Sequence, residues 1–71
     1  MLPDTILRLP DVKAATGLSR STIYARIKQG AFPAPVSLGG HAVGWPASEV
    51  AAWIQRRVDD GRARGEAGEG G

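Results

Sequence analysis

The stretch GLSRSTIYARIKQG, residues 17–30, predicts a short helix with two chemically different faces. Ser19 is a favourable N-cap because its hydroxyl can accept a hydrogen bond from an amide of the first turn. Leu18 and Ile23 flank it at the positions of a hydrophobic staple, so the helix is expected to begin directly after Ser19. At about 100° per residue, Ile23 and Ile27 share one stripe, and polar side chains cover the opposite half. One face therefore suits a protein core and the other suits a polar partner.

A first helix is predicted just before this stretch. Pro10 suits the first turn of a helix, and Asp11 complements the positive end of the helix dipole. Gly17 follows at the position where a helix C-terminus needs a positive φ angle. Two helices separated by such a tight turn match the helix-turn-helix motif.

A β-hairpin is predicted by the segment VSLGGHAV, residues 36–43. Gly39 and Gly40 would form a two-residue loop whose turn type needs positive φ. With that loop, Leu38 would face His41 across the strands. Val36 would likewise face Val43.

A third helix is predicted after the hairpin, with Pro46 as its first residue. Val50, Trp53 and Ile54 recur at i, i+3 and i+4 and form one apolar stripe. Because the core of so short a chain is thin, Trp53 and Trp45 are expected to anchor it rather than to stack on a ligand. Phe32 is a further candidate for the core.

The predicted organisation is one small domain followed by a tail. Residues 1–7 are expected to form a short strand or arm, with Ile6 or Leu7 reaching the core. Residues 58–71, VDDGRARGEAGEGG, lack hydrophobic periodicity and are expected to be a disordered polar tail. Residues 1–57 then form a mainly α winged helix-turn-helix domain, with three helices and a two-stranded wing.

Composition excludes several classes of function. With 71 residues, no cysteine and one histidine, we expect no disulfide, no metal site, no cofactor and no large catalytic pocket. No nucleophile–base pair, carboxylate pair or phosphate loop can be assembled, so the chain is not expected to be an enzyme. No apolar run approaches the roughly 20 residues of a membrane span, and no signal peptide is recognisable. The cytoplasm is the expected compartment.

Charge is distributed unevenly along the chain. Up to residue 57, seven basic residues accompany only three acidic ones, whereas the remainder is net acidic. A basic surplus on a small domain favours an anionic partner, of which nucleic acid is the commonest. The alternative is that these charges only aid solubility.

Candidate contacts to double-stranded DNA lie on the second helix and at the hairpin loop. The first half of the second helix of a helix-turn-helix enters the major groove. Arg20 is the best candidate for a bidentate contact to guanine. The full set of candidates is Arg20, Ser21, Thr22, Tyr24, Lys28, Gly40 and His41.

The candidates differ in their expected roles. Tyr24 and Lys28 are expected to hold phosphates, although the Tyr24 ring could instead cover the edge of the core. His41, next to Gly40, would touch a phosphate or enter the minor groove; the alternative is a plain surface histidine. Ser19 is expected to be structural.

Residues 7–54 resemble the AlpA family of phage and prophage regulators, small winged-helix proteins of the MerR-like and excisionase-like kind. The resemblance rests on GLSRSTIY in the second helix, FPAPVSLGG before the hairpin loop, AVGW after it and SEVAAWI in the last helix. It implies a sequence-specific DNA-binding protein that controls transcription of an integrated element, commonly its integrase or excision genes. Ala25 and His41 stand where the family usually carries basic residues.

Two other functions remain open. The first is an excisionase, which bends DNA beside an attachment site and recruits integrase. The second is a protein-interaction module that uses the same fold without reading DNA. Because no heptad pattern follows Ile54, we expect a monomer in solution, with any cooperativity arising on DNA.

Overall fold

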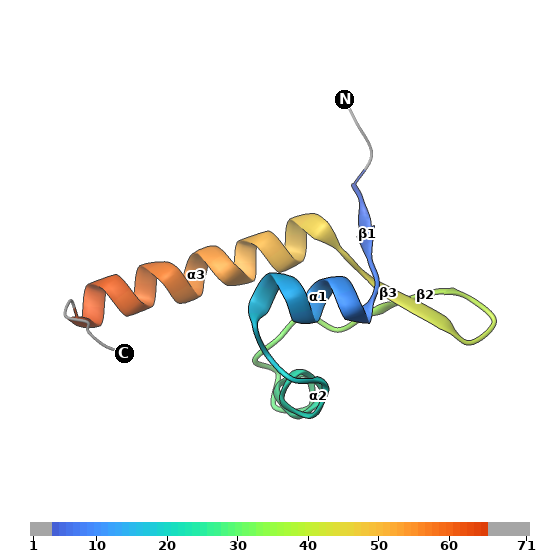
Figure 1. Ribbon diagram of the computed structural model, residues 1–71, viewed down its shortest axis with the longest axis horizontal. Helices are drawn as coiled ribbons and strands as arrows, with labels where there is room; N and C mark the ends of the chain where they lie inside the picture. The colour runs from blue at the N-terminus through green and yellow to red at the C-terminus, as the bar shows by residue number, and fades with distance from the viewer. Residues whose placement is uncertain (1–3, 66–71) are drawn as a thin grey trace.

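The computed structural model describes residues 4–65. Its elements are β1 (Ile6–Leu7), α1 (Leu9–Thr16), α2 (Arg20–Lys28), β2 (Val36–Gly39), β3 (Ala42–Pro46) and α3 (Ala47–Gly65) (Figure 1). Three helices with a small antiparallel sheet confirm the predicted winged helix-turn-helix fold. None of the helices in this range combines the length and the apolar character needed to cross a membrane.

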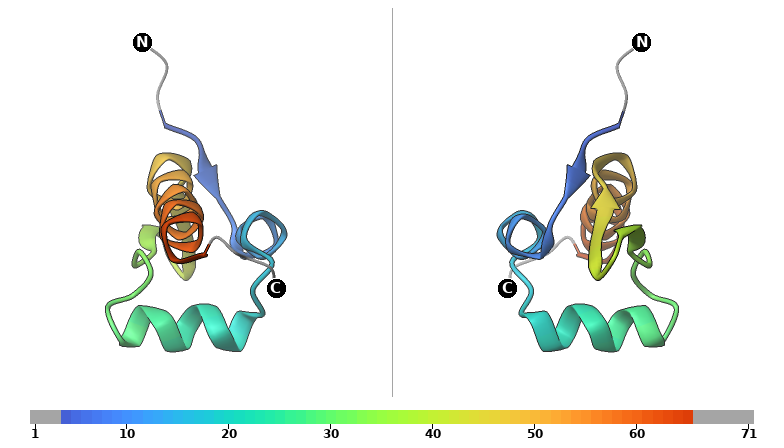
Figure 2. Two further views of the ribbon diagram at one scale, coloured as in Figure 1. Left: turned by 90° about the vertical axis from the view of Figure 1, so that its left-hand side faces the viewer. Right: turned by 90° about the vertical axis from the view of Figure 1, so that its right-hand side faces the viewer.

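The predicted turn between α1 and α2 is confirmed in detail. Gly17 adopts φ 74° after α1, and its amide donates to the Lys13 carbonyl at 2.8 Å. Ser19 then has extended backbone angles, and its hydroxyl accepts a 3.2 Å hydrogen bond from the amide of Thr22. These two caps end one helix and begin the next within three residues, and α2 crosses below α1 and α3 (Figure 2).

The sheet contains one strand more than the predicted hairpin. β3 is its central strand, and β1 and β2 both pair with it in antiparallel fashion. Ile6 pairs with Pro46, and Leu7 pairs with Trp45. A short strand at these residues was expected, and its pairing with β3 ties the chain's beginning to the wing. Residues 1–3 of the predicted arm lie outside the described residues.

The predicted hairpin register is wrong. Gly39 belongs to β2 and pairs with Ala42, so the loop consists of Gly40 and His41. Val36 pairs with Gly44 rather than with Val43. The physical reason is an irregularity between Ser37 and Gly39, where the Ser37 hydroxyl accepts from the Gly39 amide at 3.3 Å. The extra residue in β2, Leu38, shifts the partners, and the positive φ angles of Gly39 and Gly40 accommodate it.

The core confirms the roles expected for both tryptophans. Its buried side chains are Val12, Ile23, Phe32, Trp45, Val50 and Trp53. The Trp45 indole donates to the Pro33 carbonyl at 2.9 Å, and the Trp53 indole donates to the Ala31 carbonyl at 2.7 Å. Both rings therefore fill the core and fix the segment that connects α2 to the wing.

The third helix differs from its prediction at both ends. Pro46 closes β3, and the helix begins at Ala47. The disorder predicted from residue 58 is wrong for residues 58–65, since α3 continues to Gly65 and extends beyond the rest of the molecule (Figure 1). Pairs one turn apart support this extension: Gln55 donates to Asp59 at 3.0 Å, and Arg57 donates to Asp60 at 2.8 Å. The last part of the predicted tail, residues 66–71, lies outside the described residues.

Candidate nucleic-acid interface

Helix α2 separates a buried face from an exposed polar one. Ile23 is fully buried and Ile27 packs against the same core, which fixes the rotation of the helix about its axis. The side chains of Arg20, Ser21 and Lys28 are exposed on the remaining surface. These three predicted contact residues are thus accessible to a partner.

Arg20 and Tyr24 are in direct contact one helical turn apart. The guanidinium carbon of Arg20 lies 5.7 Å from the centroid of the Tyr24 ring. The same ring meets Trp45 edge-on, with centroids 6.3 Å apart and an interplanar angle of 63°. Tyr24 therefore covers the edge of the core, as its alternative interpretation predicts, while 37% of the residue stays exposed.

Thr22 takes part in the helix cap. Its amide donates to the Ser19 hydroxyl, and its own hydroxyl oxygen accepts a 3.0 Å hydrogen bond from that hydroxyl. Ser19 is structural, as expected. Thr22 is half-buried, and both its amide and its hydroxyl are hydrogen-bonded within the protein.

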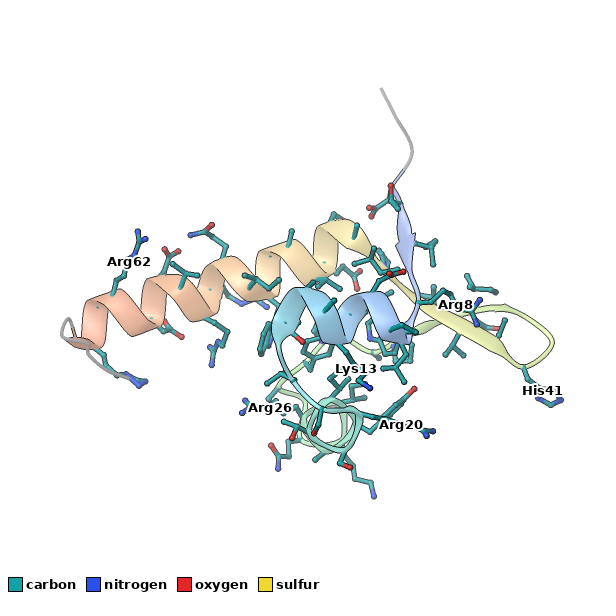
Figure 3. The ribbon with its side chains drawn as sticks, in the orientation of Figure 1. Arg8, Lys13, Arg20, Arg26, His41 and Arg62 are labelled. Carbon is teal, nitrogen blue, oxygen red and sulfur yellow. The ribbon has the colours of Figure 1, made fainter. Side chains whose placement is uncertain are left out.

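The wing turn presents Gly40 and His41 away from the core. Both residues are exposed, and Gly40 has φ 57°. His41 projects from the tip of the wing, and Arg20 leaves α2 on the side of the wing (Figure 3). Arg26 leaves α2 on the opposite side. The predicted residues therefore form two separate groups, one on α2 and one at the wing tip.

The two segments that carry these groups lack acidic side chains. Neither α2 nor the residues from Val36 to Pro46 include an aspartate or glutamate. Asp4, near the sheet, accepts hydrogen bonds from the hydroxyl and amide of Ser48, and these bonds lower the pKa of its carboxyl group. Within residues 4–65, no cluster of three or more acidic or histidine side chains could hold a metal ion.

Two further basic residues were not singled out from the sequence. Lys13 projects from α1 on the side of α2, and Arg8 lies beside the sheet (Figure 3). Both are exposed. Both belong to the basic surplus of residues 1–57. Their positions relative to α2 and the wing become visible only in the folded protein, where α1 packs on the sheet. Sequence patterns within α1 carry no such signal.

Comparisons with known proteins identify the family of this sequence. The sequence model of a family described as prophage CP4-57 regulatory protein (AlpA) matches residues 5–58. The uncharacterized protein ORF88 of Enterobacteria phage P4 is 53% identical over 68 residues, covering 90% of this chain and 76% of the phage protein. The DNA-binding transcriptional activator AlpA of Escherichia coli (strain K12) is 38% identical over 58 residues, covering 73% of this chain and 83% of AlpA.

Proposed function

This chain belongs to the AlpA family of prophage regulatory proteins, and on that basis we propose that it binds double-stranded DNA sequence-specifically and regulates transcription of a phage or an integrated element. The observation that carries the proposal is the division of α2 into a buried apolar face and an exposed, carboxylate-free face headed by Arg20. The printed description of the Escherichia coli relative as a DNA-binding transcriptional activator supports it.

In the proposed complex, the first half of α2 lies in the major groove. Arg20 contacts a guanine edge through two hydrogen bonds, a contact worth about 1–3 kcal/mol of discrimination against other bases. Ser21 and Thr22 face neighbouring bases or sugars. Lys28 and the hydroxyl of Tyr24 hold phosphates, which orient the helix without reading sequence.

The wing supplies a second contact in this proposal. His41 and the backbone of Gly40 approach a phosphate or the adjacent minor groove. The exposure of both residues and the lack of carboxylates in the hairpin support this arrangement. The genes under control would be those of integration or excision, as the family resemblance implies.

The test is selection of binding sites from random DNA duplexes, followed by titration of the selected site across salt concentrations. Arg20→Ala should bind more weakly and lose discrimination at one base pair. Arg62→Ala is the matched control, because it removes the same charge from the far end of α3 (Figure 3). The logarithm of the wild-type binding constant should fall linearly with the logarithm of salt concentration.

The outcome also decides between the remaining functions. A common motif that requires Arg20 supports an operator-binding regulator. Repeated motifs with bending of the duplex in gel mobility would instead indicate an excisionase that acts with integrase. No enrichment, together with equal weak binding by both variants, would overturn the proposal in favour of a protein-interaction module.

A further inference from the structure

We propose that Tyr24 is a positioning residue for Arg20: its ring holds the guanidinium in place before DNA arrives and thereby sets how strictly one base pair is read. The inference rests on the proposed DNA-binding function. It assigns Tyr24 a role that acts through another side chain, distinct from a phosphate contact by its hydroxyl.

Trp45, which contacts the Tyr24 ring, is held rigidly. Trp45 is fully buried, its backbone pairs with Leu7 in the centre of the sheet, and its indole donates to the Pro33 carbonyl at 2.9 Å. A ring held by packing, strand pairing and a hydrogen bond has little freedom to move. Trp45 therefore provides a fixed surface at the edge of the core.

Tyr24 is supported on that surface. Its ring meets Trp45 at 6.3 Å between centroids and 63° between planes, the edge-to-face arrangement that aromatic pairs prefer. The preceding residue, Ile23, is fully buried, so α2 cannot rotate to release the ring. One side of the tyrosine is thus fixed while another remains open.

Arg20 occupies the open side. Its guanidinium carbon lies 5.7 Å from the Tyr24 centroid, within the range of a cation–π contact. Among residues 4–65 Arg20 forms no salt bridge, so its N–H donors stay available. The ring restrains the planar group without using those donors. Restraint before binding reduces the side-chain entropy lost on forming a two-point contact to a base.

The two roles of Tyr24 can be separated by substitution. Tyr24→Phe keeps the ring and removes the hydroxyl, whereas Tyr24→Leu removes the ring. We expect Tyr24→Phe to discriminate the base pair read by Arg20 as wild type does. Tyr24→Leu should lose about two- to fivefold of that discrimination, the range of an exposed cation–π contact. In the Arg20→Ala background, Tyr24→Leu should cause no further loss of discrimination.

A measurement on the free protein tests the positioning without DNA. By NMR relaxation, the Arg20 Nε–H should be more ordered than that of Arg62 in wild type and in Tyr24→Phe, and should lose this excess order in Tyr24→Leu. Circular dichroism would verify folding of each variant. If Tyr24→Leu does not fold, the wild-type comparison of Arg20 with Arg62 still decides, since equal mobility would overturn the proposal.

Failure of this proposal differs from failure of the proposed function. If neither wild type nor any variant binds a specific duplex, the proposed function fails. The NMR comparison then tests by itself whether Tyr24 restrains Arg20. If wild type binds specifically and Tyr24→Leu discriminates equally well, the positioning role is overturned. An equal loss in Tyr24→Phe and Tyr24→Leu would also overturn it, because the hydroxyl would then carry the effect.

Discussion

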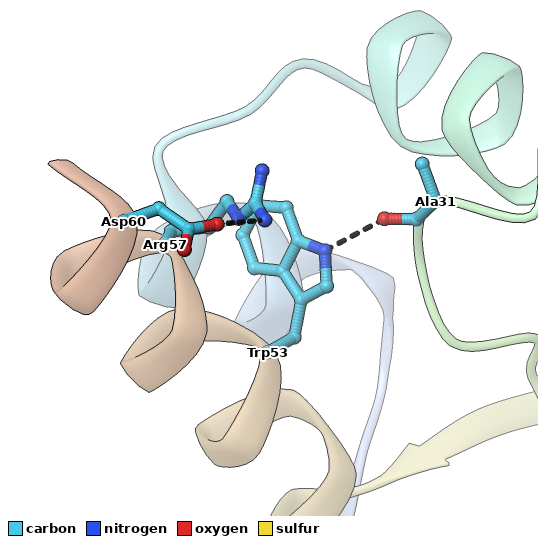
Figure 4. A network of polar contacts seen from close by, with 4 residues as sticks. All are labelled: Ala31, Trp53, Arg57 and Asp60. Atoms are coloured by element: carbon cyan, nitrogen blue, oxygen red, sulfur yellow. Dashed lines mark hydrogen bonds and ion pairs between the residues drawn. The ribbon is translucent and has the colours of Figure 1, made fainter. Parts of the chain in front are cut away.

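The indole N–H of Trp53 donates a 2.7 Å hydrogen bond to the carbonyl of Ala31, and this bond joins α3 to the segment that leaves α2 (Figure 4). The Trp53 ring also packs edge-on against Phe32, with 4.9 Å between the ring centroids. On its exposed side, Arg57 lies over the ring at 5.6 Å and pairs with Asp60. The course of the chain where it leaves α2 therefore depends on a residue of α3.

Trp53→Phe should destabilise the domain by about 1–3 kcal/mol. The substitution keeps an aromatic ring but removes the donor to Ala31 and part of the buried surface. Urea denaturation followed by circular dichroism measures the change. Arg57→Ala is the control: its ion pair with Asp60 is about half exposed and should contribute no more than about 1 kcal/mol. Equal losses in the two variants would contradict the importance of the indole hydrogen bond.

Gly44→Ala should also destabilise the domain, by about 1–3 kcal/mol, through overpacking. A Cβ atom at this position would collide with Cγ2 of Ile6 and would lie 3.0 Å from the Leu7 carbonyl oxygen. Backbone strain is not the cause of this loss of stability, since the φ angle of Gly44 is not positive. Thermal unfolding of Gly44→Ala, alone and combined with Ile6→Ala, checks this mechanism. The double variant should recover part of the loss; no recovery would mean that the collision with Ile6 is not the source.

Local sequence signals were sufficient for the helix-turn-helix. Gly17, Ser19 and the Ile23–Ile27 stripe act within one or two turns, so their consequences follow from neighbouring residues. The same is true of the burial of both tryptophans, which a thin core requires. The accessible polar face of α2 could therefore be predicted together with the helix itself.

Features that depend on distant residues could not be predicted in this way. Because of the irregularity at Leu38, the wing loop consists of Gly40 and His41 and lies one residue later than predicted. Two glycines in succession permit either turn. The contact of Tyr24 with Trp45 joins α2 to β3 and appears only after folding. Helix α3 continues past the apolar stripe, where side-chain pairs one turn apart replace a hydrophobic period that the sequence lacks.

Asp4→Ala should destabilise the domain at neutral pH, with an effect that disappears in acid. Asp4 accepts from the hydroxyl and amide of Ser48 in the first turn of α3, and these hydrogen bonds lower the pKa of its carboxyl group. A lowered pKa in the folded state means that the stabilisation is present above the unfolded-state pKa. It is lost as the pH falls through the folded-state value.

Chemical denaturation of wild type and Asp4→Ala from pH 7 to pH 2 measures this linkage. The difference in unfolding free energy should be constant near neutrality and should shrink below about pH 4, where free aspartate begins to protonate. Asp59→Ala serves as a control, because it removes an exposed carboxylate that accepts a hydrogen bond from a neutral side chain, that of Gln55, within α3. A difference that persists unchanged at pH 2 would show that the charge of Asp4 is not what stabilises the helix start.

His41→Arg should tighten DNA binding. Arginine at the exposed wing tip places a permanent positive charge where a phosphate is proposed to lie. No carboxylate in the hairpin would compete for that charge. His41→Arg should therefore bind the selected duplex several-fold more tightly than wild type, as measured by fluorescence anisotropy at constant pH and salt.

Two further comparisons make the origin of this effect specific. His41→Gln should bind no more tightly than wild type, because glutamine carries no charge. The salt dependence should agree: one added phosphate contact in His41→Arg should steepen the slope of the logarithm of the binding constant against the logarithm of salt concentration by about one unit. Equal affinity and an equal salt slope in wild type and His41→Arg would remove His41 from the proposed interface.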